Sequence, residues 1–135
     1  MKYVLMTALI LFGIRTTAQN QSELVKHYEN YYKQMKSQGD AQGIINGLTH
    51  LNILSPSEAR EDTLAYVYMR ESKFIQALNT IGTEARETDS NLALEVKAFS
   101  LKSINQPGLA IVHFEEMFIR SMYHLKIQNY YSSLW

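Results

Sequence analysis

The chain has 135 residues, 46% of them hydrophobic, which is enough for one domain with a buried core. The composition favours an all-α fold, because it has only six Gly and two Pro and is rich in Leu, Ala, Ile, Gln and Glu. Thirteen basic and thirteen acidic residues balance, so no broad field of charge favours nucleic acid or an anionic membrane as a partner. Because Cys is absent, the composition excludes a disulfide framework, a thiol nucleophile, a Cys-ligated zinc ion and a lipidated N-terminal Cys.

The first residues of the chain have the pattern of a secretory signal peptide. Lys2 supplies a basic start, residues 3–14 form an apolar run, and Thr16 and Ala18 suit the positions that precede cleavage before Gln19. The apolar run has 12 residues, which is too few to span a bilayer because a spanning helix needs ~20. An amphipathic or buried N-terminal helix is the alternative interpretation.

This pattern predicts how the chain is processed and where it acts. Residues 1–18 would be removed as the signal peptide, and residues 19–135 would remain as a periplasmic or secreted domain. No membrane span would be left after signal removal. Loss of Lys2 and Arg15 would leave the mature chain with two more acidic than basic residues, which further disfavours nucleic acid.

The mature segment has an apolar pattern that repeats every 33 residues. Within each unit the repeated positions follow the spacing i, i+1, i+4, which is typical of the inner stripe of a helix. A short helical hairpin cannot bury its apolar face alone, so this repeat predicts stacked hairpins. The three sets of matching positions are Ile44, Ala77 and Ala110; Ile45, Leu78 and Ile111; and Leu48, Ile81 and Phe114.

Polar breaks divide and separate the repeated units. Residues 37–42, 70–73 and 105–108 fall half way along the three units, and the Gly, Asp and Asn of the first and last breaks are residues that end or cap helices. Residues 55–58 and 87–91 carry turn residues between one unit and the next. Each unit is therefore predicted to be a helix, a tight turn and a second helix.

The middle unit resembles the tetratricopeptide repeat (TPR) family. Leu64, Ala65, Tyr68, Phe74 and Ala77 match the family's order of Leu, small residue, Tyr, aromatic residue and Ala. The outer units are looser copies of the pattern, and an unrelated helical bundle is the alternative fold. The departures in the outer units are Tyr32, Ile44 and Pro107.

The resemblance implies a short α-solenoid of about three helix-turn-helix hairpins. The repeats would cover residues 25–57, 58–90 and 91–123, and a further helix at residues 124–135 would cap the array or be a truncated repeat. Small residues would let the two helices of a hairpin approach each other closely. The small residues expected at these crossings are Ala65, Ala77, Ala98 and Ala110.

In the tetratricopeptide family the first helix of each hairpin lines a groove that holds a peptide. The resemblance places an acidic residue at one groove position in every repeat, at Glu29, Asp62 and Glu95. These carboxylates would repel a peptide's C-terminal carboxylate, so the implied ligand has spaced basic residues and an aromatic or aliphatic anchor. Glu and Lys are also common at ordinary exposed helix positions, which is the alternative interpretation. The full set of groove residues is Glu29, Lys33, Lys36, Asp62, Tyr66, Met69, Arg70, Glu95, Phe99 and Lys102.

The sequence does not point to catalysis. None of the four His residues, His27, His50, His113 and His124, has a partner at a reliable metal-ligand spacing, and the pair of His113 and Glu116 is of a kind common on helix surfaces. A serine-nucleophile motif and a phosphate-binding loop are both absent. The nine Tyr suit core and groove packing better than base stacking. We therefore expect no enzymatic activity, no catalytic or metal-binding residues and no cofactor.

Together these patterns predict a non-catalytic module of the bacterial cell envelope that interacts with a protein or peptide. The partner is not identified by any motif. The alternative is an N-terminal structural fragment of a longer tetratricopeptide array, without independent activity.

Overall fold

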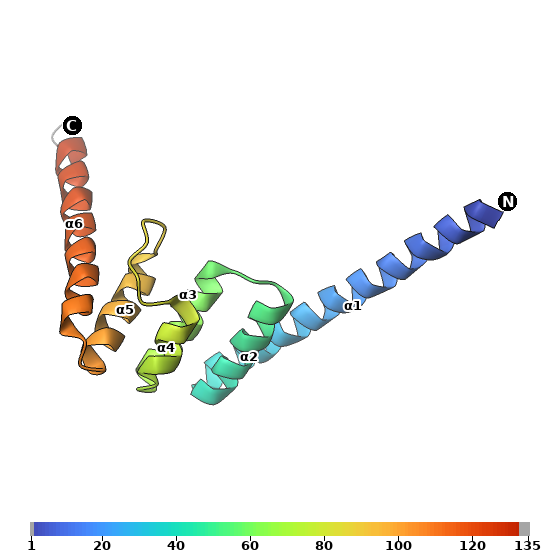
Figure 1. Cartoon of the computed structure of the whole chain (residues 1–135), viewed down its shortest axis with the longest axis horizontal. Helices are drawn as coiled ribbons and strands as arrows, with labels where there is room; N and C mark the ends of the chain where they lie inside the picture. Colours follow the sequence, from blue (N-terminus) through green and yellow to red (C-terminus); the bar gives the residue numbers. More distant parts are fainter. Residues whose placement is uncertain (1, 133–135) are drawn as a thin grey trace. The chain divides into compact units, whose positions relative to one another are not determined.

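A computed structural model describes the backbone of residues 2–132 and the side chains of residues 20–129 (Figure 1). The described backbone forms six helices and no strand, so the predicted all-α class is confirmed. Among these helices, none is both long enough and sufficiently apolar to cross a membrane. The chain divides into two compact units, a first unit of residues 1–57 and a second unit of residues 58–135, and each is described by itself.

The first unit is a single helical hairpin. Helix α1 (Lys2–Gln38) and helix α2 (Ala41–Leu54) pack against each other and are joined by a tight turn. Gly39 has a φ of +71°, a left-handed conformation that Gly adopts without steric cost. Asp40 then caps α2, because its carboxylate accepts a hydrogen bond of 3.0 Å from a backbone N–H in the first turn. The first predicted polar break is therefore a turn.

The segment predicted to be a signal peptide belongs to α1. Residues 2–18 continue this helix without a break. Met1 and the side chains of residues 2–19 lie outside the described residues. The cleavage expected between Ala18 and Gln19 stays a prediction.

Two glycines allow α2 to approach α1 closely. A side chain at Gly47 would place its Cβ only 3.3 Å from the backbone Cα of Tyr32, so α1 would have to move. A side chain at Gly43 would collide with the side chain of Met35. The tetratricopeptide pattern expects a small residue at position 32. In this hairpin the facing helix supplies it instead, at Gly47.

The second unit contains two helical hairpins. Helices α3 (Glu58–Arg70) and α4 (Phe74–Ile81) form the first, and helices α5 (Asn91–Ser103) and α6 (Pro107–Ser132) form the second. Helix α5 packs against α3 and α4 as well as against α6, so the two hairpins are stacked (Figure 1). The turns within both hairpins fall at the polar breaks that the sequence predicts.

Small residues lie inside the second unit where the helices cross. Ala65, Ala77 and Ala98 are fully buried, and Ala110 is 2% exposed. Because a methyl group is the whole side chain, neighbouring backbones can come close at these positions. The predicted burial of all four small residues is confirmed.

One residue of the predicted inner stripe lies on the wrong face. The 33-residue pattern places Ile111 inside with Ala110, but the Ile111 side chain is 54% exposed. Helix α6 turns Ala110 and His113 towards the interior of the unit. Ile111 lies one residue, or about 100°, further around the helix and therefore faces outwards.

The structure also differs from the prediction of a separate helix at residues 124–135. Helix α6 runs from Pro107 to Ser132 without a break. After Gly108 no Gly or Pro interrupts the sequence, so nothing in it ends the helix near His124. Residues 133–135 lie outside the described residues.

Candidate functional site

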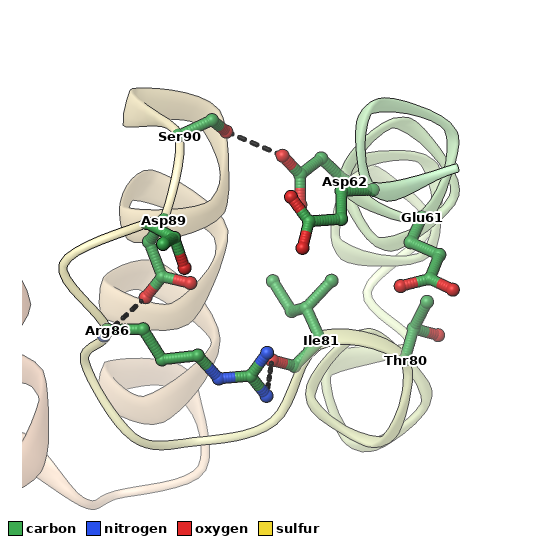
Figure 2. Close-up of a pocket in the computed structure, with 9 residues that line it drawn as sticks. Glu61, Asp62, Thr80, Ile81, Arg86, Asp89 and Ser90 are labelled. Atoms are coloured by element: carbon green, nitrogen blue, oxygen red, sulfur yellow. Dashed lines mark hydrogen bonds between the residues drawn. The ribbon is translucent and has the colours of Figure 1, made fainter. Parts of the chain in front are cut away.

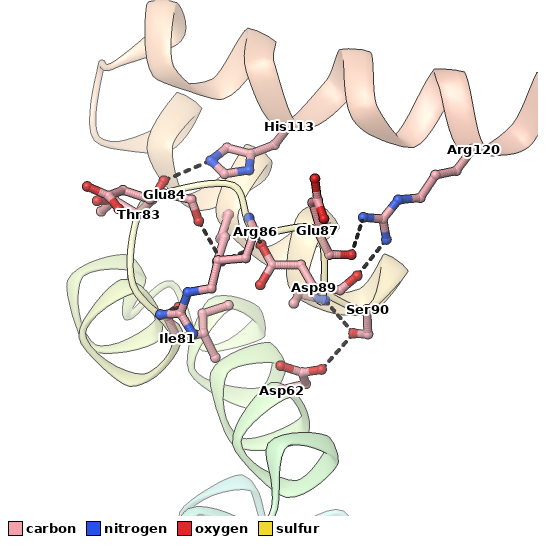
Figure 3. Close-up of polar contacts among 12 residues, drawn as sticks. Asp62, Ile81, Thr83, Glu84, Arg86, Glu87, Asp89, Ser90, His113 and Arg120 are labelled. Carbon is pink, nitrogen blue, oxygen red and sulfur yellow. Dashed lines mark hydrogen bonds and ion pairs between the residues drawn. The ribbon is translucent and has the colours of Figure 1, made fainter.

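Residues 82–90, which connect α4 to α5, are held by side chains of the following helices (Figure 3). Lys97 on α5 donates to the carbonyl oxygen of Glu84 at 2.8 Å and to the carboxylate of Asp89 at 2.6 Å. Burial by itself would raise the Asp89 pKa, but the hydrogen bonds from Lys97 and from the Arg86 backbone N–H, and the charges of both cations, lower this pKa below its ordinary value. Asp89 therefore stays ionised opposite the buried ammonium group.

Helix α6 holds the same connection at two further points (Figure 3). Nε2 of His113 lies 2.9 Å from the carbonyl oxygen of Thr83, and this nitrogen carries the hydrogen because a carbonyl only accepts. Arg120 donates to the carbonyl oxygens of Asp89 at 2.5 Å and of Glu87 at 3.2 Å, so its guanidinium group bridges two backbone positions. The interpretation of His113 as part of an exposed helix surface is wrong, since its side chain is 1% exposed.

Asp62, a predicted groove residue, takes part in capping α5. Ser90 is the N-cap of α5, and its hydroxyl accepts from the Ala93 backbone N–H at 3.0 Å while it donates to the Asp62 carboxylate at 2.6 Å (Figure 2). The carboxylate therefore lies near the positive end of the α5 dipole. Asp62 is half-buried and links α3 to α5, so it has a structural role whether or not a ligand binds.

A small polar depression lies between α3, the end of α4 and the α4–α5 connection (Figure 2). Glu58, Glu61 and Asp62 line it from one face of α3, as their i, i+3, i+4 spacing requires. Arg86 also lines it and donates to the carbonyl oxygen of Ile81 at 3.4 Å. With a volume of about 120 Å³ the depression is smaller than a typical small-molecule site of ~300 Å³ or more, so it fits one polar side chain better than a metabolite.

The predicted groove residues of α3 are only partly available to a ligand. Tyr66 and Met69 are half-buried and pack against the core cluster that contains Ala65. Arg70 is exposed, and its guanidinium group lies 3.5 Å from the Tyr66 hydroxyl. Tyr66 is therefore only partly available for contact on this helix.

The predicted groove residues of α5 are more open. Glu95 is half-buried, Phe99 is 44% exposed and Lys102 is exposed. The Phe99 ring meets the Phe114 ring edge to face, with centroids 5.5 Å apart, which fixes its orientation. Because α3 and α5 pack against each other, the structure brings the predicted residues of these two helices into one unit.

The remaining predicted groove residues lie on α1 in the first unit. Glu29 is half-buried, and Lys33 and Lys36 are exposed. The Lys36 ammonium nitrogen lies 6.0 Å from the centroid of the Tyr32 ring, at the limit of a cation–π contact. Glu29 belongs to the first unit, while its two counterparts, Asp62 and Glu95, belong to the second, so the acidic row as a whole stays a prediction.

The outer face of α6 is apolar and exposed within the second unit. Phe118 and Tyr123 are 65% and 64% exposed. Two shallow apolar grooves lie on this face, and Phe118 and Ile119 line both of them. Glu115 lines the first groove as well, and Lys126 lines the second. An exposed apolar surface of this extent is characteristic of an interaction site. The large exposed hydrophobic residues of α6 are Leu109, Ile111, Val112, Phe118, Ile119, Met122, Tyr123, Leu125 and Ile127.

Sequence reasoning did not find the buried Lys97 or the apolar face of α6. Lys97 is flanked at i−4 and i+4 by Ala93 and Leu101, and this spacing is a signal that the Lys lies on a buried helix face. The α6 face was missed because the third repeat was expected to end at residue 123 and a separate helix to follow at residues 124–135. That prediction divides one continuous helix into two parts. Reading residues 107–132 as one helix would have brought its apolar stripe together.

Among the described residues, no group of three or more His, Asp or Glu side chains is placed to hold a metal ion. Comparison of the chain with protein-family models, curated proteins and solved structures gives no match. Membership of the tetratricopeptide family therefore stays an expectation, and a function has to rest on the geometry of these surfaces.

Proposed function

We propose that the chain is a non-catalytic protein or peptide interaction module of the bacterial cell envelope, built as a short α-solenoid of tetratricopeptide-like hairpins and exported by residues 1–18. The observation that carries this proposal is the packing of α5 against both helices of the preceding hairpin. In a stack of this kind, the first helices of successive hairpins lie side by side and offer an extended surface to a ligand. Helices α3 and α5 are these first helices.

The ligand that we infer is a peptide segment with spaced basic residues and an aromatic or aliphatic anchor. Asp62 and Glu95 supply negative charge on two helices that pack together. Tyr66 and Phe99 supply partly exposed aromatic rings on the same two helices. Charge attraction would speed the encounter, while contact with the rings would supply most of the affinity.

This function can be tested with the full chain and a fluorescein-labelled peptide in which Lys alternates with Phe. The double variant Glu61→Gln/Glu95→Gln removes the Glu95 carboxylate and the carboxylate that lies beside Asp62 in the polar depression, but it leaves Asp62, whose hydrogen bond supports the fold. We expect fluorescence anisotropy at low salt to show about tenfold weaker binding, because screening is then least. The matched control is Glu71→Gln/Glu84→Gln, which removes two exposed carboxylates elsewhere in the same unit.

Two results would reject this function. Equal weakening by both double variants would mean that net charge alone governs the interaction. Failure of the parent chain to bind the Lys-Phe peptide better than a Glu-Phe peptide would remove the inferred ligand class.

A further inference from the structure

We propose that the exposed face of α6 binds a second copy of this chain, with the two α6 helices antiparallel. The proposal concerns a different helix from those of the peptide groove, α3 and α5, and does not depend on that groove. It rests on the arrangement of apolar and charged side chains along one helix.

The centre of the face consists of four large hydrophobic residues. Phe118 and Met122 form one stripe at a spacing of four residues, and Ile119 and Tyr123 form the adjoining stripe at the same spacing. Their side chains are 65%, 43%, 48% and 64% exposed in that order. A contiguous apolar patch of this kind is uncommon on a monomer, because leaving it in water costs free energy that an interface recovers.

Two side chains of opposite charge flank this apolar centre, one on each side along the helix. Glu115 lies three residues before Phe118, and Lys126 lies three residues after Tyr123. Both side chains are exposed. Each lines one of the two shallow grooves, together with Phe118 and Ile119. The face is therefore apolar in the middle, negative at one end and positive at the other.

The positions of these residues are symmetric about a point between residues 120 and 121. This point relates position 115 to 126, position 118 to 123 and position 119 to 122. In a two-fold symmetric interface, residue i meets residue j of the other copy and j meets i. An antiparallel pair of α6 helices would therefore bring Glu115 opposite Lys126 of the partner subunit, twice in each dimer. A parallel pair would bring like charges opposite each other, so the charge pattern selects the antiparallel arrangement.

The size of the face sets the expected strength of the dimer. Exposed hydrophobic residues extend from Leu109 to Ile127, which is about 27 Å along a helix. A single helix pair of this length buries less than a standard interface of ~800 Å² for each partner. We therefore expect a dimer that dissociates at about micromolar concentration rather than a permanent one.

The decisive experiment exchanges the two charges in the full chain. Glu115→Lys makes both ends of the face positive, and Lys126→Glu makes both ends negative. In sedimentation velocity runs from about 1 to about 100 µM, each single variant is expected to self-associate at least about tenfold more weakly than the parent. The two single variants mixed together, and the double variant Glu115→Lys/Lys126→Glu, are expected to associate like the parent, because every opposed pair is again of opposite sign.

A matched control makes the same charge changes at exposed positions that do not belong to α6. Glu71→Lys and Lys26→Glu are expected to associate like the parent both alone and when mixed. This control separates the effect of net charge from the effect of charges placed across an interface.

The absence of Cys allows the orientation to be tested by disulfide formation. Ile119→Cys mixed with Met122→Cys should give a crosslinked dimer, because these positions oppose each other in the antiparallel pair. Glu115→Cys alone should give little, since two such sites would lie about 16 Å apart along the helices, whereas a disulfide needs Cα atoms within ~7 Å. Association through any other segment would not produce this pattern of crosslinks.

The outcomes decide the proposal. A parent chain that stays monomeric over the whole range overturns it and leaves the α6 face for a different protein. Single charge variants that associate as well as the parent, or a crosslink from Glu115→Cys as strong as that between positions 119 and 122, overturn it as well. The binding of the Lys-Phe peptide is measured separately, so failure of the dimer and failure of the peptide groove are distinguishable.

Discussion

The ammonium group of Lys97 lies 2.6 Å from the carboxylate of Asp89, and the two side chains are 0% and 8% exposed. The same ammonium group donates to the carbonyl oxygen of Glu84. A buried cation is tolerated only when it is paired and hydrogen-bonded, and this site meets both conditions. The connection between α4 and α5 is therefore fixed to α5 by one side chain.

The first prediction concerns the loss of the carboxylate. Asp89→Asn leaves the Lys97 charge buried without its counter-ion, and removal of one partner of such a pair typically costs roughly 3–5 kcal/mol. We expect a loss of about 3 kcal/mol in the free energy of unfolding, measured with urea and circular dichroism. The double variant Asp89→Asn/Lys97→Met removes the charge as well and should recover most of the stability. If the double variant is as unstable as Asp89→Asn, the unpaired Lys97 charge is not the cause of the lost stability.

The second prediction concerns the loss of stability at low pH. The Asp89 pKa is lowered in the folded chain, so this group contributes stability that is present above its unfolded value, about 3.9, and is lost as pH falls through the folded value. The parent chain and Asp89→Asn should therefore differ most near neutral pH and converge below about pH 4. Urea unfolding at several pH values checks this convergence. The exposed control Glu71→Gln should follow the parent at every pH, and a constant gap for Asp89→Asn would contradict the assignment.

The third prediction concerns the crossing of α3 and α4, the hairpin whose residues match the tetratricopeptide pattern best. Ala77 is fully buried on α4, so Ala77→Trp forces a large ring between packed backbones and should cost about 3 kcal/mol. The matched control is Ile75→Trp on the same helix, where the side chain is 54% exposed and the change should cost less than about 1 kcal/mol. Equal urea midpoints for the two variants would show that Ala77 does not lie at a close crossing.

The fourth prediction concerns the first unit. Gly47→Val would press a branched side chain against the Tyr32 backbone on α1, and the displacement should cost about 2 kcal/mol. Asn46→Val places the same side chain at the neighbouring exposed position of α2 and should cost about 0.5 kcal/mol or less. The difference in urea midpoints measures the closeness of the two helices. A Gly47→Val chain as stable as Asn46→Val would mean that the hairpin can open at no cost.

The sequence by itself determined the local structure of this protein. The spacing of Leu64, Ala65 and Tyr68 predicts one helix face, and Gly39 and Asp40 predict the turn and cap that the structure shows. These features are local, since periodicity, capping and backbone conformation depend on residues a few positions apart. The four buried Ala residues also follow from the sequence, because a recurring small residue within an apolar pattern indicates a close crossing.

Only the tertiary structure decided how the helices share their surfaces. The spacing of Ala93 and Leu101 places Lys97 on a buried face of α5, but only the folded chain supplies the Asp89 carboxylate and the Glu84 carbonyl oxygen that its ammonium group bonds. Ile111 fits the repeat but faces outwards, because α5 packs against the side of α6 that carries Ala110 and His113. Burial depends on which residues of distant segments come together, and a pattern within one segment does not contain that information.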